Sequence, residues 1–177
     1  MWIDRITLAL ACLIALPAAA GPVRDLSKPM IAVAGYDKAR LVGEWFEVAR
    51  SVSPLEVDCH AVTTSIATRD DSRLTLKLAC HKGSVTGKVL ALDGVMAEVA
   101  PGLYQVRFVR LPQIGNVELA VLWAAADDSA VVVGAGTGQV GWVLTKAADP
   151  GSAVIAAGVQ VLVDNGYDPA AIAPVEH

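Results

Sequence analysis

The sequence lacks several features that would place it in particular classes of protein. It has no run of basic residues and carries a net charge of −4, so a nucleic-acid partner is not expected. Beyond residue 20, no stretch reaches the roughly 18 unbroken apolar residues that a membrane-spanning helix needs. Only 5% of the residues are aromatic. No serine or cysteine stands in a nucleophile motif, so the sequence does not predict an enzyme.

The first 20 residues have the pattern of a secretory signal peptide. Arg5 supplies the positive charge, residues 6–16 form a short apolar segment, and an Ala-x-Ala pattern ends at Ala20. We therefore expect a mature chain that begins at Gly21 and is periplasmic or secreted. Acylation at Cys12 would instead make an outer-membrane lipoprotein. That alternative is less favoured because the preceding leucine is one position too late for a lipidation motif.

Once Cys12 is removed with the signal peptide, Cys59 and Cys80 remain as an even pair in an exported chain, which predicts one disulfide. Each cysteine precedes a histidine, His60 or His81, so metal binding is the alternative. Neighbouring residues on a strand point to opposite faces, so all four side chains could not easily gather around one ion. A weak surface metal site at the two histidines stays open, but the sequence predicts no metal site and no cofactor.

Most of the chain shows the patterns of short antiparallel strands. Leu74, Leu76 and Leu78 alternate with Thr75 and Lys77, as in a sheet with one face in water. Turn residues separate the segments at regular spacing, and no helical period lies between them, which indicates a barrel or sandwich. The expected strands cover residues 44–51, 60–68, 73–80, 85–92, 103–111, 117–125, 130–133 and 140–145.

One helix is expected after the last strand. Asp149 can cap it, Pro150 suits its first position, and apolar residues then recur at helical spacing. Asn165 and Gly166 are typical of a helix C-terminus.

The chain around Trp45 carries a resemblance to a known family. The run Gly43-Glu44-Trp45-Phe46-Glu47-Val48-Ala49-Arg50 resembles the first motif of the lipocalins. The wider run from Tyr36 is similar to the bacterial outer-membrane lipocalins related to apolipoprotein D. The resemblance implies an all-β fold, an eight-stranded antiparallel up-and-down barrel with a C-terminal α-helix packed outside. The polar-to-mixed segment with Pro22 and Pro29 predicts an N-terminal arm over residues 21–42, followed by the barrel, helix and tail over residues 43–177.

The other family motifs are present in altered form. In the family, an arginine after the last strand stacks on the first-motif tryptophan, which packs across the closed end of the barrel. Here Lys146 occupies that position, and it can lie over the ring of Trp45 as a cation. The second motif is reduced to Asp127 and Asp128 and lacks its tyrosine.

The resemblance implies a periplasmic carrier of a small hydrophobic ligand, a fatty acid or lysophospholipid, with possible association with the inner leaflet of the outer membrane. A lipocalin-fold enzyme and a non-binding envelope protein with a filled barrel are the alternatives. Strand alternation places a set of side chains on the inner wall, and the resemblance implies that they contact the ligand; they are Leu76, Leu78, Val89, Tyr104, Val106, Phe108, Leu119 and Val121.

Two further patterns have ordinary interpretations. Glu47 and Arg50 could act as a general acid and an anion clamp, but we expect ordinary charges at the barrel mouth or surface. Gly136, Gly138 and Gly141 match a dinucleotide-binding pattern. That site needs a helix at the loop, within a βαβ unit, whereas a β-like segment follows here, which predicts a hairpin loop instead.

Overall fold

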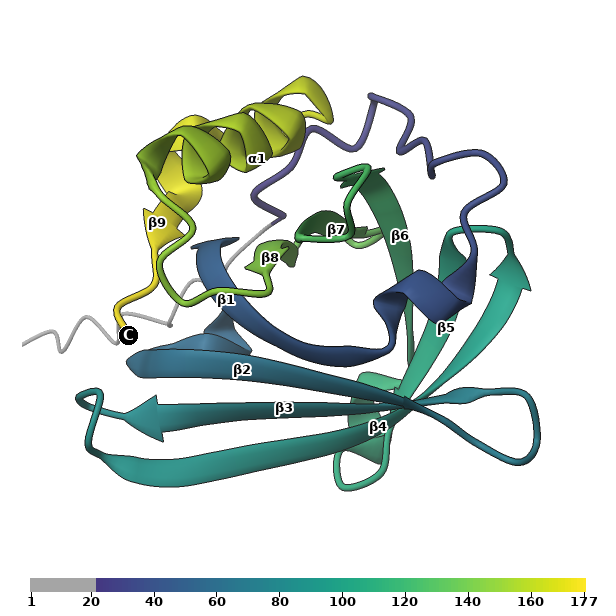
Figure 1. Ribbon diagram of the computed structural model, residues 1–177, viewed down its shortest axis with the longest axis horizontal. Helices are drawn as coiled ribbons and strands as arrows, with labels where there is room; N and C mark the ends of the chain where they lie inside the picture. The colour runs from purple at the N-terminus through teal and green to yellow at the C-terminus, as the bar shows by residue number, and fades with distance from the viewer. Residues whose placement is uncertain (1–21) are drawn as a thin grey trace, which may run out of the picture.

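The computed structural model describes residues 22–177, so the expected signal peptide and Cys12 lie outside the described residues. Eight antiparallel strands form a closed barrel, which confirms the expected fold (Figure 1). A ninth short strand and one helix, α1 (Ser152–Asp164), follow the barrel strands. The barrel strands are β1 (Gly43–Ser51), β2 (Cys59–Thr68), β3 (Leu74–Lys82), β4 (Lys88–Ala100), β5 (Leu103–Phe108), β6 (Asn116–Ala124), β7 (Ala130–Ala135) and β8 (Gly141–Thr145).

The barrel closes through β1, which pairs with β8 on one side and β2 on the other. The pairing of β1 with β2 covers only residues 43–46 of β1. Beyond that point the C-terminal tail lies between the two strands. Strand β9 (Ile172–Pro174) pairs with the end of β1, and the amide of Ala61 on β2 then donates to the carbonyl of Glu176 at 2.6 Å. The tail therefore completes the wall at one end of the barrel.

Side chains pack on both sides of this wall. Inward-facing residues form the interior core, which includes Trp45, Tyr104, Val106 and Leu144. A second cluster lies between the barrel and α1, and Figure 1 shows the helix outside the barrel on the same side as β9. Leu162 of α1 is fully buried in this outer cluster. The expected external position of the helix is thus confirmed.

Several boundaries differ from the sequence prediction; for example, β5 ends at Phe108, three residues before the expected end. The helix begins at Ser152, because Gly151 takes a left-handed φ of 87° and Asp149 accepts a hydrogen bond from the Gly151 amide without capping the helix. Strand β4 extends to Ala100, well past the expected residue 92, because the partner strands β3 and β5 hydrogen-bond along its whole length. Gly166 ends the helix with a φ of 94°, as its sequence indicated.

The N-terminal arm follows the outside of the barrel before β1. The buried guanidinium of Arg24 donates to the carbonyls of Asn165 and Lys28, at 2.7 and 2.5 Å, and so ties the arm to the end of α1. The arm then crosses to β6, where the amide of Val33 donates to the carbonyl of Val121. Within residues 22–177, no helix has the length and apolar character needed to cross a membrane.

Candidate functional site

One end of the barrel is closed by Trp45. The ring is buried, its Nε1 donates to the carbonyl of Leu41 at 2.7 Å, and Nζ of Lys146 lies 3.5 Å from the ring centroid. Desolvation lowers the pKa of Lys146 from its ordinary value. Gly43 is needed beside this contact, because it has a φ of 124° and a Cβ there would lie 2.9 Å from Nζ of Lys146. Lysine therefore occupies the place of the family arginine and covers the same ring.

Arg40 closes the same end from the side. It lies in the short helix η1 (Lys38–Leu41), and its Nε donates to Asp128 at 2.5 Å while its guanidinium lies 5.1 Å from the ring centroid of Tyr36. Burial raises the pKa of Tyr36 to about 12. The aspartate that remains of the altered second motif thus anchors the segment before β1. Sequence reasoning did not identify this ion pair.

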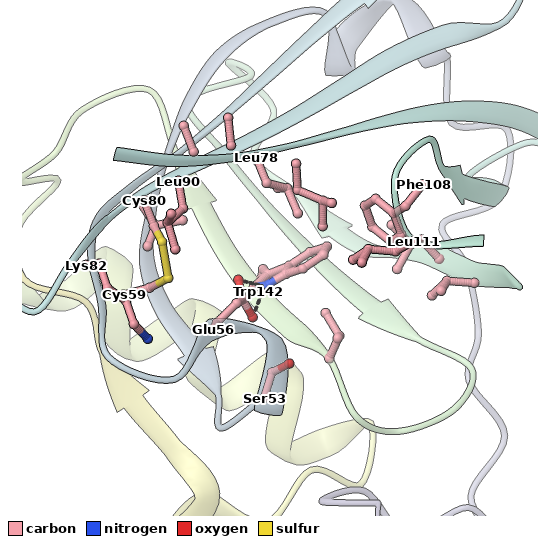
Figure 2. A pocket seen from close by; sticks show the side chains of 17 residues that line it. Ser53, Glu56, Cys59, Leu78, Cys80, Lys82, Leu90, Phe108, Leu111 and Trp142 are labelled. Carbon is pink, nitrogen blue, oxygen red and sulfur yellow. Dashed lines mark hydrogen bonds between the residues drawn. A yellow bond between two sulfur atoms is a disulfide. The ribbon is translucent and has the colours of Figure 1, made fainter. Parts of the chain in front are cut away.

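The half of the barrel next to Trp45 is packed, whereas the other half contains a cavity of about 220 Å³. Leu119 and Trp142 line both this cavity and a small void of about 20 Å³ beneath it, so they form the floor between the two halves. Figure 2 shows the indole of Trp142 among the side chains that line the larger cavity. The lining side chains are mostly apolar and include Val62, Leu78, Leu90, Leu92, Phe108, Leu111, Val117, Leu119, Val140 and Trp142.

The residues predicted to contact a ligand occupy three different environments. Leu78, Phe108 and Leu119 line the cavity. Leu76, Tyr104 and Val121 line the small void, and Val106 is fully buried in the interior core, so these four lie deeper in the barrel. The placement of Val89 on the inner wall was wrong, because Leu90 and Leu92 line the cavity and Val89, at the opposite strand parity, is 54% exposed.

The described lining of the cavity includes the polar side chains of Ser53, Glu56 and Lys82. Glu56 ends the short helix η2 (Pro54–Glu56), which folds over the open end of the barrel. Nε1 of Trp142 donates to both of its carboxylate oxygens, at 3.1 and 3.2 Å, and only 8% of Glu56 is exposed. Figure 2 shows the two side chains side by side, with dashed lines that mark these hydrogen bonds.

Glu47 and Arg50 lie beside Glu56. Glu47 is fully buried and forms an ion pair of 3.0 Å with Arg50, so the expectation of an ordinary charge at the mouth or surface was wrong. The cause is strand parity, since Glu47 lies two residues beyond the inward-facing Trp45. The guanidinium of Arg50 also donates to the carbonyls of Glu56 and Cys59. These bonds hold η2 and the start of β2 against β1.

This architecture matches a known family. A comparison with models of protein families assigns residues 36–177 to the lipocalin-like domain. The chain belongs to the lipocalin family. A search of curated proteins finds no match.

Solved lipocalin structures share the fold at low sequence identity. Insecticyanin of the tobacco hornworm Manduca sexta is 16% identical, with a TM-score of 0.62 over 84% of this lipocalin and 85% of its own chain. Lobster apocrustacyanin A1 is 11% identical, with a TM-score of 0.61 over 80% and 79% of the two chains. The cockroach allergen Per a 4 is 14% identical, with a TM-score of 0.64 over 86% and 96%. These similarities support the fold alone.

The two buried glutamates of this lipocalin, Glu47 and Glu56, differ in how far their pKa values are raised. Burial, and then the neighbouring Glu56, raise the pKa of Glu47 well above its ordinary value. Burial also raises the pKa of Glu56, but Arg50 and hydrogen bonds from Trp142 and Glu47 oppose that rise. The pKa of Glu47 is thus raised further than that of Glu56, so Glu47 is the carboxyl that retains its proton to the higher pH.

The cysteines form the predicted disulfide, which lies on the cavity wall (Figure 2). His60 and His81 face each other on β2 and β3, and His60 approaches Glu176 at 3.2 Å. Among residues 22–177, no three histidine, cysteine or acidic side chains gather as metal ligands. The glycine-rich segment connects β7 to β8 as a hairpin loop, as its sequence indicated.

Proposed function

We propose that this lipocalin is an exported protein that binds and carries a fatty acid or a lysophospholipid, with the acyl chain inside the open half of the barrel. The observation that carries this proposal is the apolar cavity of about 220 Å³ above Leu119 and Trp142. Burying an acyl chain there contributes up to about 0.8 kcal/mol for each methylene removed from water. Members of the lipocalin family are generally binding and transport proteins, which agrees with this function.

Lys82 supports an outward position for the lipid head group. It is exposed, it lines the mouth of the cavity, and its Nζ donates to the carbonyl of Val57. An ammonium there can pair with a carboxylate or a phosphate that stays in water. The chain would then extend from Lys82 toward Phe108, across the floor formed by Trp142.

The mouth also carries exposed apolar side chains. Val57, Val89 and Leu90 are 58%, 54% and 45% exposed, and the exposed Lys82 and Lys88 lie in the same region of the chain. This combination of apolar and cationic side chains favours contact with an anionic membrane. These side chains support the proposal that the protein acts in the periplasm and contacts the inner leaflet of the outer membrane transiently, in the manner of the bacterial lipocalins related to apolipoprotein D.

The two alternative functions receive less support. A barrel filled to both ends would have no cavity above Trp142. An enzyme that depends on a reactive thiol would need a free cysteine, whereas Cys59 and Cys80 are bonded to each other. The disulfide also agrees with an oxidising compartment such as the periplasm.

Titration with saturated fatty acids and lysophospholipids of 8 to 18 carbons, roughly the range of biological chains, tests the proposal. Affinity should increase with chain length, by up to about 0.8 kcal/mol per methylene, and then level off when the cavity is full. Affinity that does not change with chain length would indicate adsorption to the surface and would contradict the proposal.

A further inference from the structure

Among residues 22–177, the one carboxylate that lines the cavity belongs to Glu56. It lies among apolar side chains, with Ser53 and Lys82 as the other polar members of the lining. A buried charge of this kind costs free energy unless hydrogen bonds satisfy it. The hydrogen-bond partners of Glu56 therefore indicate which ligands the cavity can bind.

The charges of Glu47, Glu56 and Arg50 sum to zero when the two glutamates together hold one proton. Within residues 22–177, Oε2 of Glu47 has no hydrogen-bond donor, although the atom is buried. A proton on Glu47 resolves this, because the protonated carboxyl donates toward Glu56. The pair then carries one negative charge, which the guanidinium of Arg50 neutralises. The imidazole of His177 is a further titratable group beside this pair, and its Nε2 lies 2.8 Å from the backbone carbonyl of Glu47.

Glu56 still has capacity to accept hydrogen bonds. An ionised carboxylate offers about four lone-pair sites. The indole of Trp142 and the proton of Glu47 occupy part of that capacity. Glu56 lines the cavity, and apart from Ser53 and Lys82 the side chains described around that cavity are apolar.

We propose that Glu56 is the polar anchor of the ligand and that the cavity selects single-chain amphiphiles that carry an O–H or N–H donor beside the chain, as an alcohol or an amine does. This inference rests on the proposed function, since it assumes that an acyl or alkyl chain occupies the cavity. A free hydroxyl next to the chain satisfies Glu56 without a change in net charge. An ionised carboxylate offers no donor and is repelled, so a fatty acid has to keep its head group near Lys82.

Two isomeric ligands test the proposal on the unaltered protein. Decan-1-ol and 1-methoxynonane have the same atoms, but only the alcohol can donate a hydrogen bond. The alcohol should bind roughly tenfold to a hundredfold more tightly, which is the effect of one hydrogen bond to a buried charged acceptor. Equal affinities would overturn the proposal while leaving the proposed function intact. If neither isomer binds, the proposed function fails, and this inference fails with it.

Decylamine tests whether an amine can supply the hydrogen-bond donor in place of a hydroxyl group. An ammonium ion adds a positive charge, so its binding should displace the proton of Glu47, whereas an alcohol should displace none. Calorimetry in two buffers with different ionisation enthalpies measures this release. Up to one proton per amine, and none per alcohol, is the expected result. An amine that binds no better than 1-methoxynonane would exclude amines as ligands and limit the site to hydroxyl donors.

The variant Glu56→Leu tests whether the preference for the alcohol over the ether depends on Glu56. It should bind the alcohol and the ether with equal affinity, because leucine accepts no hydrogen bond. The exposed Glu118 provides a matched control, and Glu118→Leu should keep the full preference for the alcohol. Circular dichroism verifies that each variant folds. A folded Glu56→Leu protein that still prefers the alcohol would overturn the assignment.

Discussion

Nζ of Lys146 lies 3.5 Å from the centroid of the Trp45 ring, so the last barrel strand is joined to the first by a cation over an aromatic face. The contact closes one end of the barrel, while Nε1 of the same indole donates to Leu41 in the segment before β1. The packed half of the barrel is built on this tryptophan. The open half, in contrast, is held by Arg50 and its three acceptors.

The variant Trp45→Ala should lower the free energy of unfolding by about 3–5 kcal/mol, because it removes the largest buried side chain of the closed end and leaves a cavity. Denaturant melts measure the loss. Lys146→Met provides a comparison, since it keeps most of the side-chain volume but removes the charge, and it should cost about 1 kcal/mol. A loss below about 1 kcal/mol for Trp45→Ala would contradict the role assigned to this residue.

Stability should depend on pH through Glu47. Its pKa is raised in the folded protein, so the folded state holds a proton that the unfolded chain releases above about pH 4.3, the ordinary glutamate value. The free energy of unfolding should therefore fall as pH rises from about 4.3 toward the folded pKa, by up to about 1.4 kcal/mol per pH unit. Glu56 contributes with the same sign.

The variant Glu47→Gln isolates this effect, because an amide does not titrate. Its free energy of unfolding should decline less steeply over the same pH range than that of the unaltered protein. Asp71→Asn is the control with the opposite sign, since Arg73 and Arg69 lower the pKa of Asp71, whose contribution is lost as pH falls. Equal slopes for Glu47→Gln and the unaltered protein would show that Glu47 is ionised in the fold.

Removing residues 172–177 should open the barrel wall between β1 and β2. The amide of Val175 donates to Val48 and the amide of Ala61 donates to Glu176, so at least about 2 kcal/mol of stability should be lost at roughly 1 kcal/mol per bond. Hydrogen exchange at Ala61 should become much faster. The variant His177→Ala removes only a side chain and should leave Ala61 protected. Unchanged protection of Ala61 after the truncation would show that the tail is not part of the wall.

Lipid binding should depend on Phe108. The variant Phe108→Asp places an unpaired charge on the cavity wall, which must lose its hydration or bring water into the cavity, so affinity for a long-chain lipid should fall at least tenfold. Val109→Asp is the matched control, because Val109 is the next residue and is 65% exposed. Circular dichroism should show an intact sheet in both variants. Equal affinities would place the lipid elsewhere.

Much of the fold followed from local patterns in the sequence. Alternation along β3 placed Leu76 and Leu78 inside the barrel, and the count of cysteines in an expected exported chain identified the disulfide. These features depend on short segments or on composition. Strand β9 did not follow, because its three residues form a strand only through pairing with the end of β1.

The polar part of the candidate site was largely missed, for physical reasons. A glutamate on a strand is ordinarily exposed, and only the parity of Trp45 could have indicated that Glu47 points inward. Glu56 belongs to a loop between two strands, where no periodic pattern predicts burial. Its position is set by Arg50, which binds the Glu56 carbonyl, and by Trp142 from β8, a contact between distant parts of the chain.

The most direct test of a ligand inside the barrel is the intermolecular nuclear Overhauser effect between a bound twelve-carbon lysophospholipid and the methyl groups of the protein. If the acyl chain occupies the cavity, its methylenes should show contacts with Leu78 and Leu119 and none with the exposed Val99. Contacts confined to Val99 and other exposed methyl groups, with none to Leu78 or Leu119, would show that the lipid binds outside the barrel.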